Sequence, residues 1–176
     1  MEVDGVEDRA GSWAEIASDI KADVLANGVD ERGVFTQHYD TDALDASVLL
    51  IPMVGFLPPS DHRVRKTVLA VADELMEGGL VLRQRPEAEF AIEGETFAVC
   101  SFWLVAALSD IGENERAREM MERLLAYSSP LGLYAEHIDP DTGRHLGNFP
   151  HAFTHLALIS SAVRLIRVEE RVVSVV

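Results

Sequence analysis

The stretch LGLYAEHIDPDTGRHLGNFPHAFTHLALI, residues 131–159, decides the fold of this chain. It begins as a polar loop with one glutamate, Glu136, continues through a turn and an Asn-Phe-Pro stop, and ends in an apolar helix that starts near Pro150. A carboxylate held on a structured loop beside a helix start can act as a general base. The stretch therefore predicts the last helix and a candidate reactive group ahead of it.

Apolar residues recur at helical spacing along most of the chain, which predicts an all-α fold of six helices. We expect the first helix to begin at a capping box of Ser12 and Glu15, the third to be capped by Asp61, and the fourth to end at Gly112. Strand signal is limited to residues 33–39 and 80–84. The apolar stripes are Trp13, Ile16, Ala17, Ile20 and Val24; a shorter segment, 43–54; Val64, Val68, Val71, Ala72 and Leu75; Phe97, Ser101, Leu104, Ala107, Leu108 and Ile111; Ala117, Met120, Met121, Leu124 and Leu125; and Phe153, Leu156, Ile159, Val163 and Ile166.

Long connections follow the first, third and fifth helices, at about residues 29–41, 78–96 and 129–149, and the other connections are shorter. In an up-and-down helical array alternate connections lie at the same end, so these loops should form one face, as functional loops commonly do. Their mixture of carboxylates, guanidinium groups and rings suits a polyhydroxylated ligand, and the alternative is ordinary solvated loop residues. The residues concerned are Gln37, His38, Asp42, Arg83, Arg85, Glu87, Glu93, Glu95, Tyr134, Glu136 and His137.

The bulk composition is that of one globular domain, with 48% hydrophobic and 26% charged residues. Because 30 acidic residues face 15 basic ones, for a net charge of -15, we expect neither nucleic acid nor a membrane as a partner. The acidic start is unlike a secretory signal, and no apolar run is long enough to span a bilayer, which favours a cytoplasmic location. We expect a flexible segment at 1–11, the domain at 12–168 and a tail at 169–176.

Several single residues have structural interpretations. Cys100 lies in an apolar run and is expected to be a buried thiol. His151 and His155 have a metal-compatible spacing, but neither a zinc-protease glutamate nor an acidic third ligand is near them in sequence, so no metal is expected. Asp42 and Asp45 stand where a helix cap is needed. No organic cofactor is expected either.

Four stretches together resemble the glucoamylase-type glycoside hydrolases of family 15, which include bacterial and archaeal trehalases. They are DALDASVLLIPMVGFLPPSDHRV (42–64), GLVLRQR (79–85), EGETFAVCSFWLVAAL (93–108) and the opening stretch, and they occur in the family's order. The resemblance implies an (α/α)6 barrel, of which the six expected helices, as three hairpins, would form the carboxyl-terminal half. It also implies inverting hydrolysis of an α-glucoside (maltose, a longer glucan or trehalose).

The same resemblance implies roles for single residues. Glu136 corresponds to the family's general base, and Arg83 or Arg85, with Arg83 favoured, corresponds to a sugar-holding arginine. His137 would orient Glu136 or touch ligand, although a solvated histidine is as consistent with the sequence. Tyr134 would stack on a sugar ring or anchor the loop to the core.

One departure from the family concerns its general acid, which lies upstream near a Trp-Glu pair followed by Arg-Gly. The tryptophans here, Trp13 and Trp103, fall in other contexts, at a helix start and inside the fourth helix. This chain would therefore carry the general-base half of a site and expose apolar helix faces that call for a protein partner or self-association. The alternative is a non-catalytic helical remnant that binds sugar or another chain.

Overall fold

Six α-helices carry the fold in the computed structural model, which describes residues 6–85 and 96–173. Two antiparallel strand pairs, β1 with β2 and β3 with β4, are the other regular elements in these ranges, apart from one 3-10 helix. In chain order the elements are α1 (Val6–Asn27), the 3-10 helix η1 (Ala46–Leu49), α2 (Leu50–Met53), α3 (His62–Glu74), β1 (Met76–Glu77), β2 (Leu80–Val81), α4 (Ala98–Asp110), α5 (Asn114–Ala126), β3 (His137–Ile138), β4 (His145–Leu146) and α6 (Ala152–Val173).

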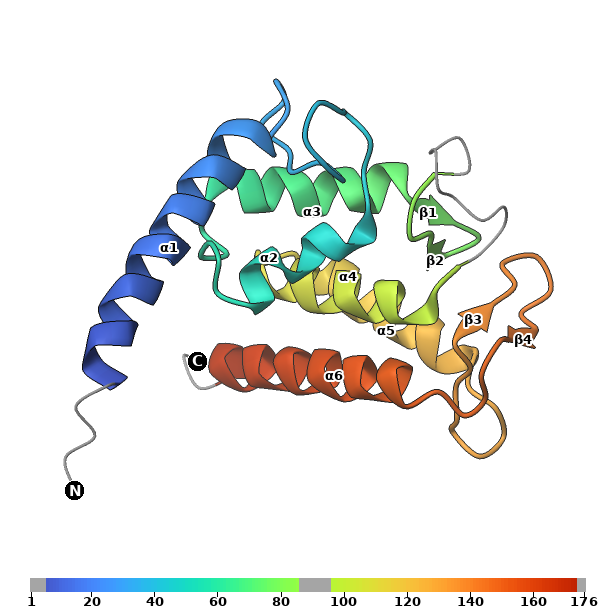
Figure 1. Cartoon of the computed structure of the whole chain (residues 1–176). Helices are drawn as coiled ribbons and strands as arrows, with labels where there is room; N and C mark the ends of the chain where they lie inside the picture. Colours follow the sequence, from blue (N-terminus) through green and yellow to red (C-terminus); the bar gives the residue numbers. More distant parts are fainter. Residues whose placement is uncertain (1–5, 86–95, 174–176) are drawn as a thin grey trace.

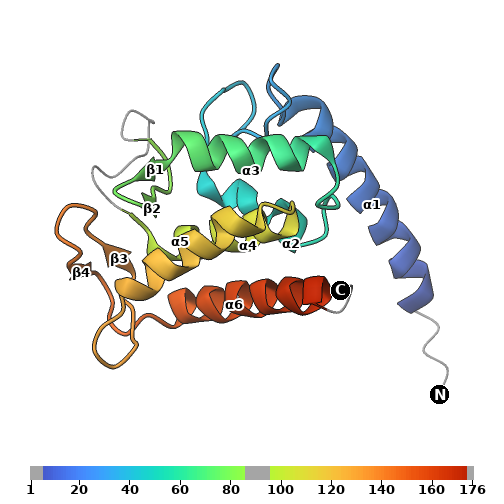
Figure 2. The same cartoon turned by 180° about the vertical axis from the view of Figure 1, so that it is seen from behind.

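Helix α3 packs on α4, and α5 packs on α6, while α1 lies at one side of the molecule (Figures 1 and 2). Helix α4 occupies the middle and packs against α2, α3, α5 and α6. Eleven of its 13 residues are buried, which explains why its sequence is apolar on nearly every side. The arrangement is half of an (α/α)6 barrel, as predicted.

Local signals in the sequence set several helix ends. Asp61 caps α3, because its carboxylate accepts a hydrogen bond from the backbone N–H of Arg63 at 2.9 Å. Hydrogen bonds and an ion pair with Arg63 lower the pKa of Asp61 to about 2. Asp45 caps η1 by accepting from the N–H of Ser47 at 2.8 Å. Gly112, with φ of 85°, follows the end of α4.

Three expectations about element ends were wrong or incomplete. Helix α1 begins at Val6, so Ser12 lies inside it and the capping box at Ser12 and Glu15 does not form its start. The sequence of residues 6–10 holds no proline or glycine, which lets the helix extend upstream. The segment 43–54 contains η1 and α2 rather than one continuous helix. Helix α6 continues to Val173, so the first residues of the expected tail are helical.

The apolar stripes of α1 and α6 face outward. On α6, Leu156 is 64% exposed and Ile159 is 59% exposed, while Thr154, Ala157 and Leu165 form the buried side. The protein thus has unpartnered apolar faces, as expected of half a barrel. The exposed residues are Trp13, Ile16 and Ile20 on α1, and Phe153, Leu156, Ile159, Val163 and Ile166 on α6, which we call the α1/α6 face.

Cys100 is fully buried, and burial raises the pKa of its thiol to about 12, which confirms a structural role. Within residues 6–85 and 96–173 the protein has no helix with the length and apolarity needed to cross a membrane.

Candidate active site

The second and third long connections lie at the end of the half-barrel that carries β1 to β4, and the first runs over α3 toward the same end (Figure 1). The first is joined to the second by the side chains of Gln37 and Gln84, at 2.6 Å, and η1 is joined to the second by a hydrogen bond from Ala46 N to Arg83 O, at 2.8 Å. The third is fixed to the start of α4 by a bond from Ala98 N to Glu136 O, at 2.9 Å. The predicted loop face is therefore present in the described residues.

Glu136 lies immediately before β3, and the segment after β4 holds its carboxylate. Its Oε2 accepts hydrogen bonds from the side-chain amide of Asn148, at 2.8 Å, and from the backbone N–H of Asn148, at 3.2 Å. In return, Glu136 N donates to Asn148 O at 2.9 Å. The Asn148 backbone donor, the nearby imidazoles of His137 and His151, and the Asn148 amide lower the pKa of Glu136, against a smaller desolvation effect. Glu136 is therefore a carboxylate at neutral pH, as a general base must be.

His137 lies beside the other carboxylate oxygen. Its Nε2 is 3.9 Å from Oε1 of Glu136, which is too long for a direct hydrogen bond. The ring stacks on Phe97 with centroids 5.3 Å apart, and its Nδ1 is buried without a hydrogen-bond partner. His137 therefore lies next to Glu136 without orienting it through a hydrogen bond, and a contact of its ring with a ligand stays a prediction.

Of the two candidate arginines, Arg83 is held in place. Its Nε lies 3.4 Å from Oδ2 of the buried Asp45, while the side chain is otherwise largely exposed toward solvent. Arg85 is also exposed. Both belong to the same end of the molecule as Glu136.

The structure corrects the prediction that Tyr134 binds substrate. Tyr134 is only 1% exposed, and its hydroxyl donates to the carbonyl oxygen of Leu124 at the end of α5, at 3.1 Å. Its ring packs edge-on against Phe102. With no face open to a sugar, Tyr134 anchors the loop to the core, which was the alternative role.

The remaining loop and histidine candidates have local partners. Nδ1 of His38 is 2.6 Å from Tyr39 O, and Asp42 is exposed and does not cap η1. Both ring nitrogens of His155 contact backbone groups, Tyr134 N and His151 O. No cluster of three metal-ligating side chains occurs among the residues described. Three predicted members of the loop face, Glu87, Glu93 and Glu95, lie outside those residues.

Two features of the site were not predicted from the sequence. One is Asn148; the only signal was its place between Gly147 and the Phe-Pro pair, which is typical of a turn. The other is a row of aromatic contacts that runs from Phe97, beside His137, to Phe153 and on to Trp103, with centroid distances of 6.4 and 5.7 Å.

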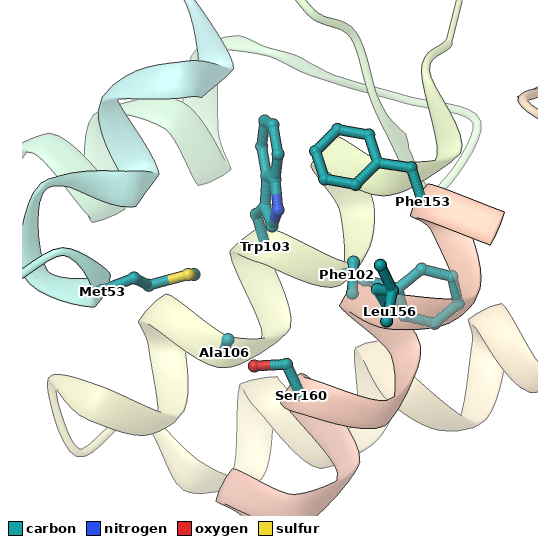
Figure 3. Close-up of a pocket in the computed structure, with 8 residues that line it drawn as sticks. Met53, Phe102, Trp103, Ala106, Phe153, Leu156 and Ser160 are labelled. Atoms are coloured by element: carbon teal, nitrogen blue, oxygen red, sulfur yellow. The ribbon is translucent and has the colours of Figure 1, made fainter.

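The aromatic row leads to an apolar pocket of about 160 Å³ (Figure 3). In Figure 3 the rings of Trp103 and Phe153 stand at one end of it, and Met53 from α2 and Ser160 from α6 approach from opposite sides. Its volume is below the range of about 300–1,000 Å³ usual for small-molecule sites. The pocket is therefore better suited to an apolar side chain than to a sugar.

The sequence model of the family described as glycosyl hydrolases family 15 matches residues 2–163. The chain belongs to this family. Because the family model covers most of the chain and the helical fold agrees with what the resemblance implied, the protein is a glycoside hydrolase homologue.

Its curated relatives include proteins named trehalase. One from Mycolicibacterium smegmatis is 60% identical over 172 residues, which cover 96% of this chain and 26% of that protein. One from Thermoplasma volcanium is 35% identical over 156 residues, covering 87% and 25%. A solved structure titled as a wild-type glycosidase aligns with a TM-score of 0.74 at 22% identity, covering 88% of this chain and 44% of that one. The chain thus spans about a quarter of the length of these curated relatives.

Proposed function

We propose that this chain supplies the general-base half of a trehalose-hydrolysing active site. The observation that carries the proposal is the ionised Glu136, which Asn148 holds at the end of the half-barrel where the second and third long connections lie. The identity of 60% to a protein named trehalase favours trehalose over maltose or a longer glucan as the α-glucoside.

In the proposed reaction, Glu136 removes a proton from a water molecule as that water attacks the anomeric carbon from the face opposite the leaving sugar. A second carboxyl group protonates the leaving oxygen, and the configuration is inverted. Proton donation to a leaving group typically contributes about 100- to 10,000-fold in rate. We assign that acid to the other half of the barrel, and we expect the 176-residue chain by itself to show no measurable turnover.

The surface that would receive the other half is the α1/α6 face. Its side chains are large and apolar, with Trp13 68% exposed and Leu156 64% exposed. The pocket between α2, α4 and α6 continues this surface inward. An exposed area of this kind marks an interaction site. We therefore propose that the partner is the remaining part of a family 15 barrel, on this or another polypeptide, rather than an unrelated protein.

A chimera provides a direct test. The 172 matched residues of the Mycolicibacterium smegmatis trehalase are replaced by the corresponding residues of this chain, and glucose release from trehalose and from maltose is measured. We expect hydrolysis of trehalose in which the attacked glucose unit is released as the β-anomer and the leaving glucose as the α-anomer, as a polarimetric or NMR assay would show. Glu136→Gln should abolish the activity, because the amide cannot accept the proton, and the matched surface change Glu122→Gln should preserve it.

Two results would contradict the proposal. A folded chimera that retains full activity as Glu136→Gln would exclude Glu136 as the base. A folded chimera with no activity toward any α-glucoside, but with glucose binding by calorimetry, would favour the alternative of a non-catalytic sugar-binding remnant.

A further inference from the structure

Glu136 has two carboxylate oxygens in unlike surroundings. Oε2 accepts two hydrogen bonds, both from Asn148, at 2.8 Å from the side-chain amide and at 3.2 Å from the backbone N–H. Oε1 has the imidazole Nε2 of His137 at 3.9 Å, beyond hydrogen-bonding range. The carboxyl group is partly exposed, with 26% of the Glu136 side chain accessible. Oε2 is therefore held by the protein, whereas Oε1 accepts no hydrogen bond from the residues that the structure describes.

The backbone conformation at Gly147 allows Asn148 to make both hydrogen bonds to Oε2 of Glu136. Gly147 has a φ of 72°, and a Cβ atom at this residue would stand 3.0 Å from Oε2 of Glu136 and 3.0 Å from Cδ2 of His137. A side chain there would press directly on the carboxylate and the imidazole. Glycine lets the segment approach closely enough for both donors of the next residue, Asn148, to reach the same oxygen.

We propose that Asn148 is the positioning residue of the general base, and that it reserves Oε1 of Glu136 as the atom that accepts the proton of the attacking water. The inference rests on the proposed function. Two donors from one residue fix both the position and the rotation of the carboxyl group, because an oxygen that accepts both bonds cannot exchange places with the other without losing them. The lone pairs of Oε1 then point to the open side, where a water can also contact Nε2 of His137.

The same bonds stabilise the ionised form. A donor to a carboxylate favours the charged state. The backbone N–H of Asn148 lowers the pKa of Glu136 most and its side-chain amide least, so loss of the amide alone should raise that pKa only in part. The groups that face this carboxylate are Asn148 itself and the imidazoles of His137 and His151. Asn148 is exposed to solvent, so replacing it should not remove a buried contact from the core.

The test compares Asn148→Ala and the isosteric Asn148→Asp in the 176-residue chain. The carboxyl carbon of Glu136 is followed by ¹³C NMR against pH and is assigned by its disappearance in Glu136→Gln. We expect the pKa of Glu136 to rise in Asn148→Ala, and to rise further in Asn148→Asp, which adds a like charge. Asn27→Ala is the matched control, because Asn27 also donates to a carboxylate, at 2.9 Å from Asp23, but on α1. It should leave Glu136 unchanged.

The trehalase chimera provides the kinetic measurement. Misplacing a catalytic group by about 1 Å costs on the order of 100-fold in rate, so Asn148→Ala should lower kcat by about that factor with little change in KM. The acidic limb of its pH–rate profile should move to higher pH. An unchanged Glu136 titration in both Asn148 variants, or an unchanged kcat and pH profile, would overturn the inference. Neither result would contradict the proposed function, because that proposal is tested by the activity of the Glu136→Gln chimera.

Discussion

Replacing Tyr134 tests whether this residue anchors the loop or contacts sugar. In Tyr134→Phe the hydrogen bond to Leu124 O is lost, but that carbonyl still accepts from Tyr127 N at 3.1 Å and is not left unpaired. The expected cost is therefore that of one net hydrogen bond, about 1 kcal/mol of unfolding free energy. For a chain of this size the cost corresponds to a Tm about 2–4 °C lower.

Tyr134→Ala removes the ring as well. Because Tyr134 is buried and packs against Phe102 and His155, we expect a loss of about 3–5 kcal/mol, which is typical of truncating a buried aromatic residue. Urea unfolding of the 176-residue chain, followed by circular dichroism, measures both values. Tyr39→Phe is the control, since its hydroxyl bonds Asp23 at the surface, and it should change stability by less than about 0.5 kcal/mol.

The refuting result concerns Tyr134→Phe. If it unfolds like the unchanged protein but raises KM for trehalose in the chimera, then the hydroxyl contacts substrate and the anchoring role is wrong.

Three further outcomes are expected. Leu156→Glu should leave the stability of the isolated chain nearly unchanged, because Leu156 is 64% exposed, but should abolish activity of the chimera by burying a charge against the other half, as glucose release would reveal. Gly147→Ala should destabilise the chain more than Gly55→Ala in thermal unfolding. Both glycines have positive φ, but of the two only Gly147 has neighbouring atoms that an added Cβ would meet. Gly55→Ala reports the backbone cost alone, about 1–2 kcal/mol. Asp61 has a pKa lowered from 3.8 to about 2, so its contribution to stability is present above 3.8 and is lost as the pH falls toward 2. Asp61→Asn, which keeps a capping side chain, should remove this part of the acid dependence in urea titrations, and an equal loss in both proteins over that range would contradict the assignment.

The helices that were predicted well are those whose local signals and burial agree. Helix α3 has a capping aspartate at its start and valines at helical spacing, and Val64, Val68 and Val71 are all buried. Helix α4 ends just before a glycine with positive φ. The capping box at Ser12 failed because such a box needs a chain that leaves the helix there, and the preceding residues continue it instead.

Periodicity could show that α1 and α6 are amphipathic, but not what covers them. Ile20 and Ile159 have the spacing of core residues but are exposed, because no part of the chain that the structure describes covers them. Sequence patterns likewise indicated some residues of the candidate site and missed others, because a pattern does not record contacts made through a turn. Glu136 stands in a recognisable motif, whereas the bond from Asn148 joins residues 12 apart through a turn whose geometry no pattern records. Tyr134 fitted two roles equally until its burial was known.

Helix α4 is enclosed by neighbours from this chain alone. The hydrophobic interior consequently closes around this helix, and the buried core includes none of the exposed apolar side chains of α1 and α6. Substitutions on those exposed side chains can therefore change the surface of the protein without opening its interior.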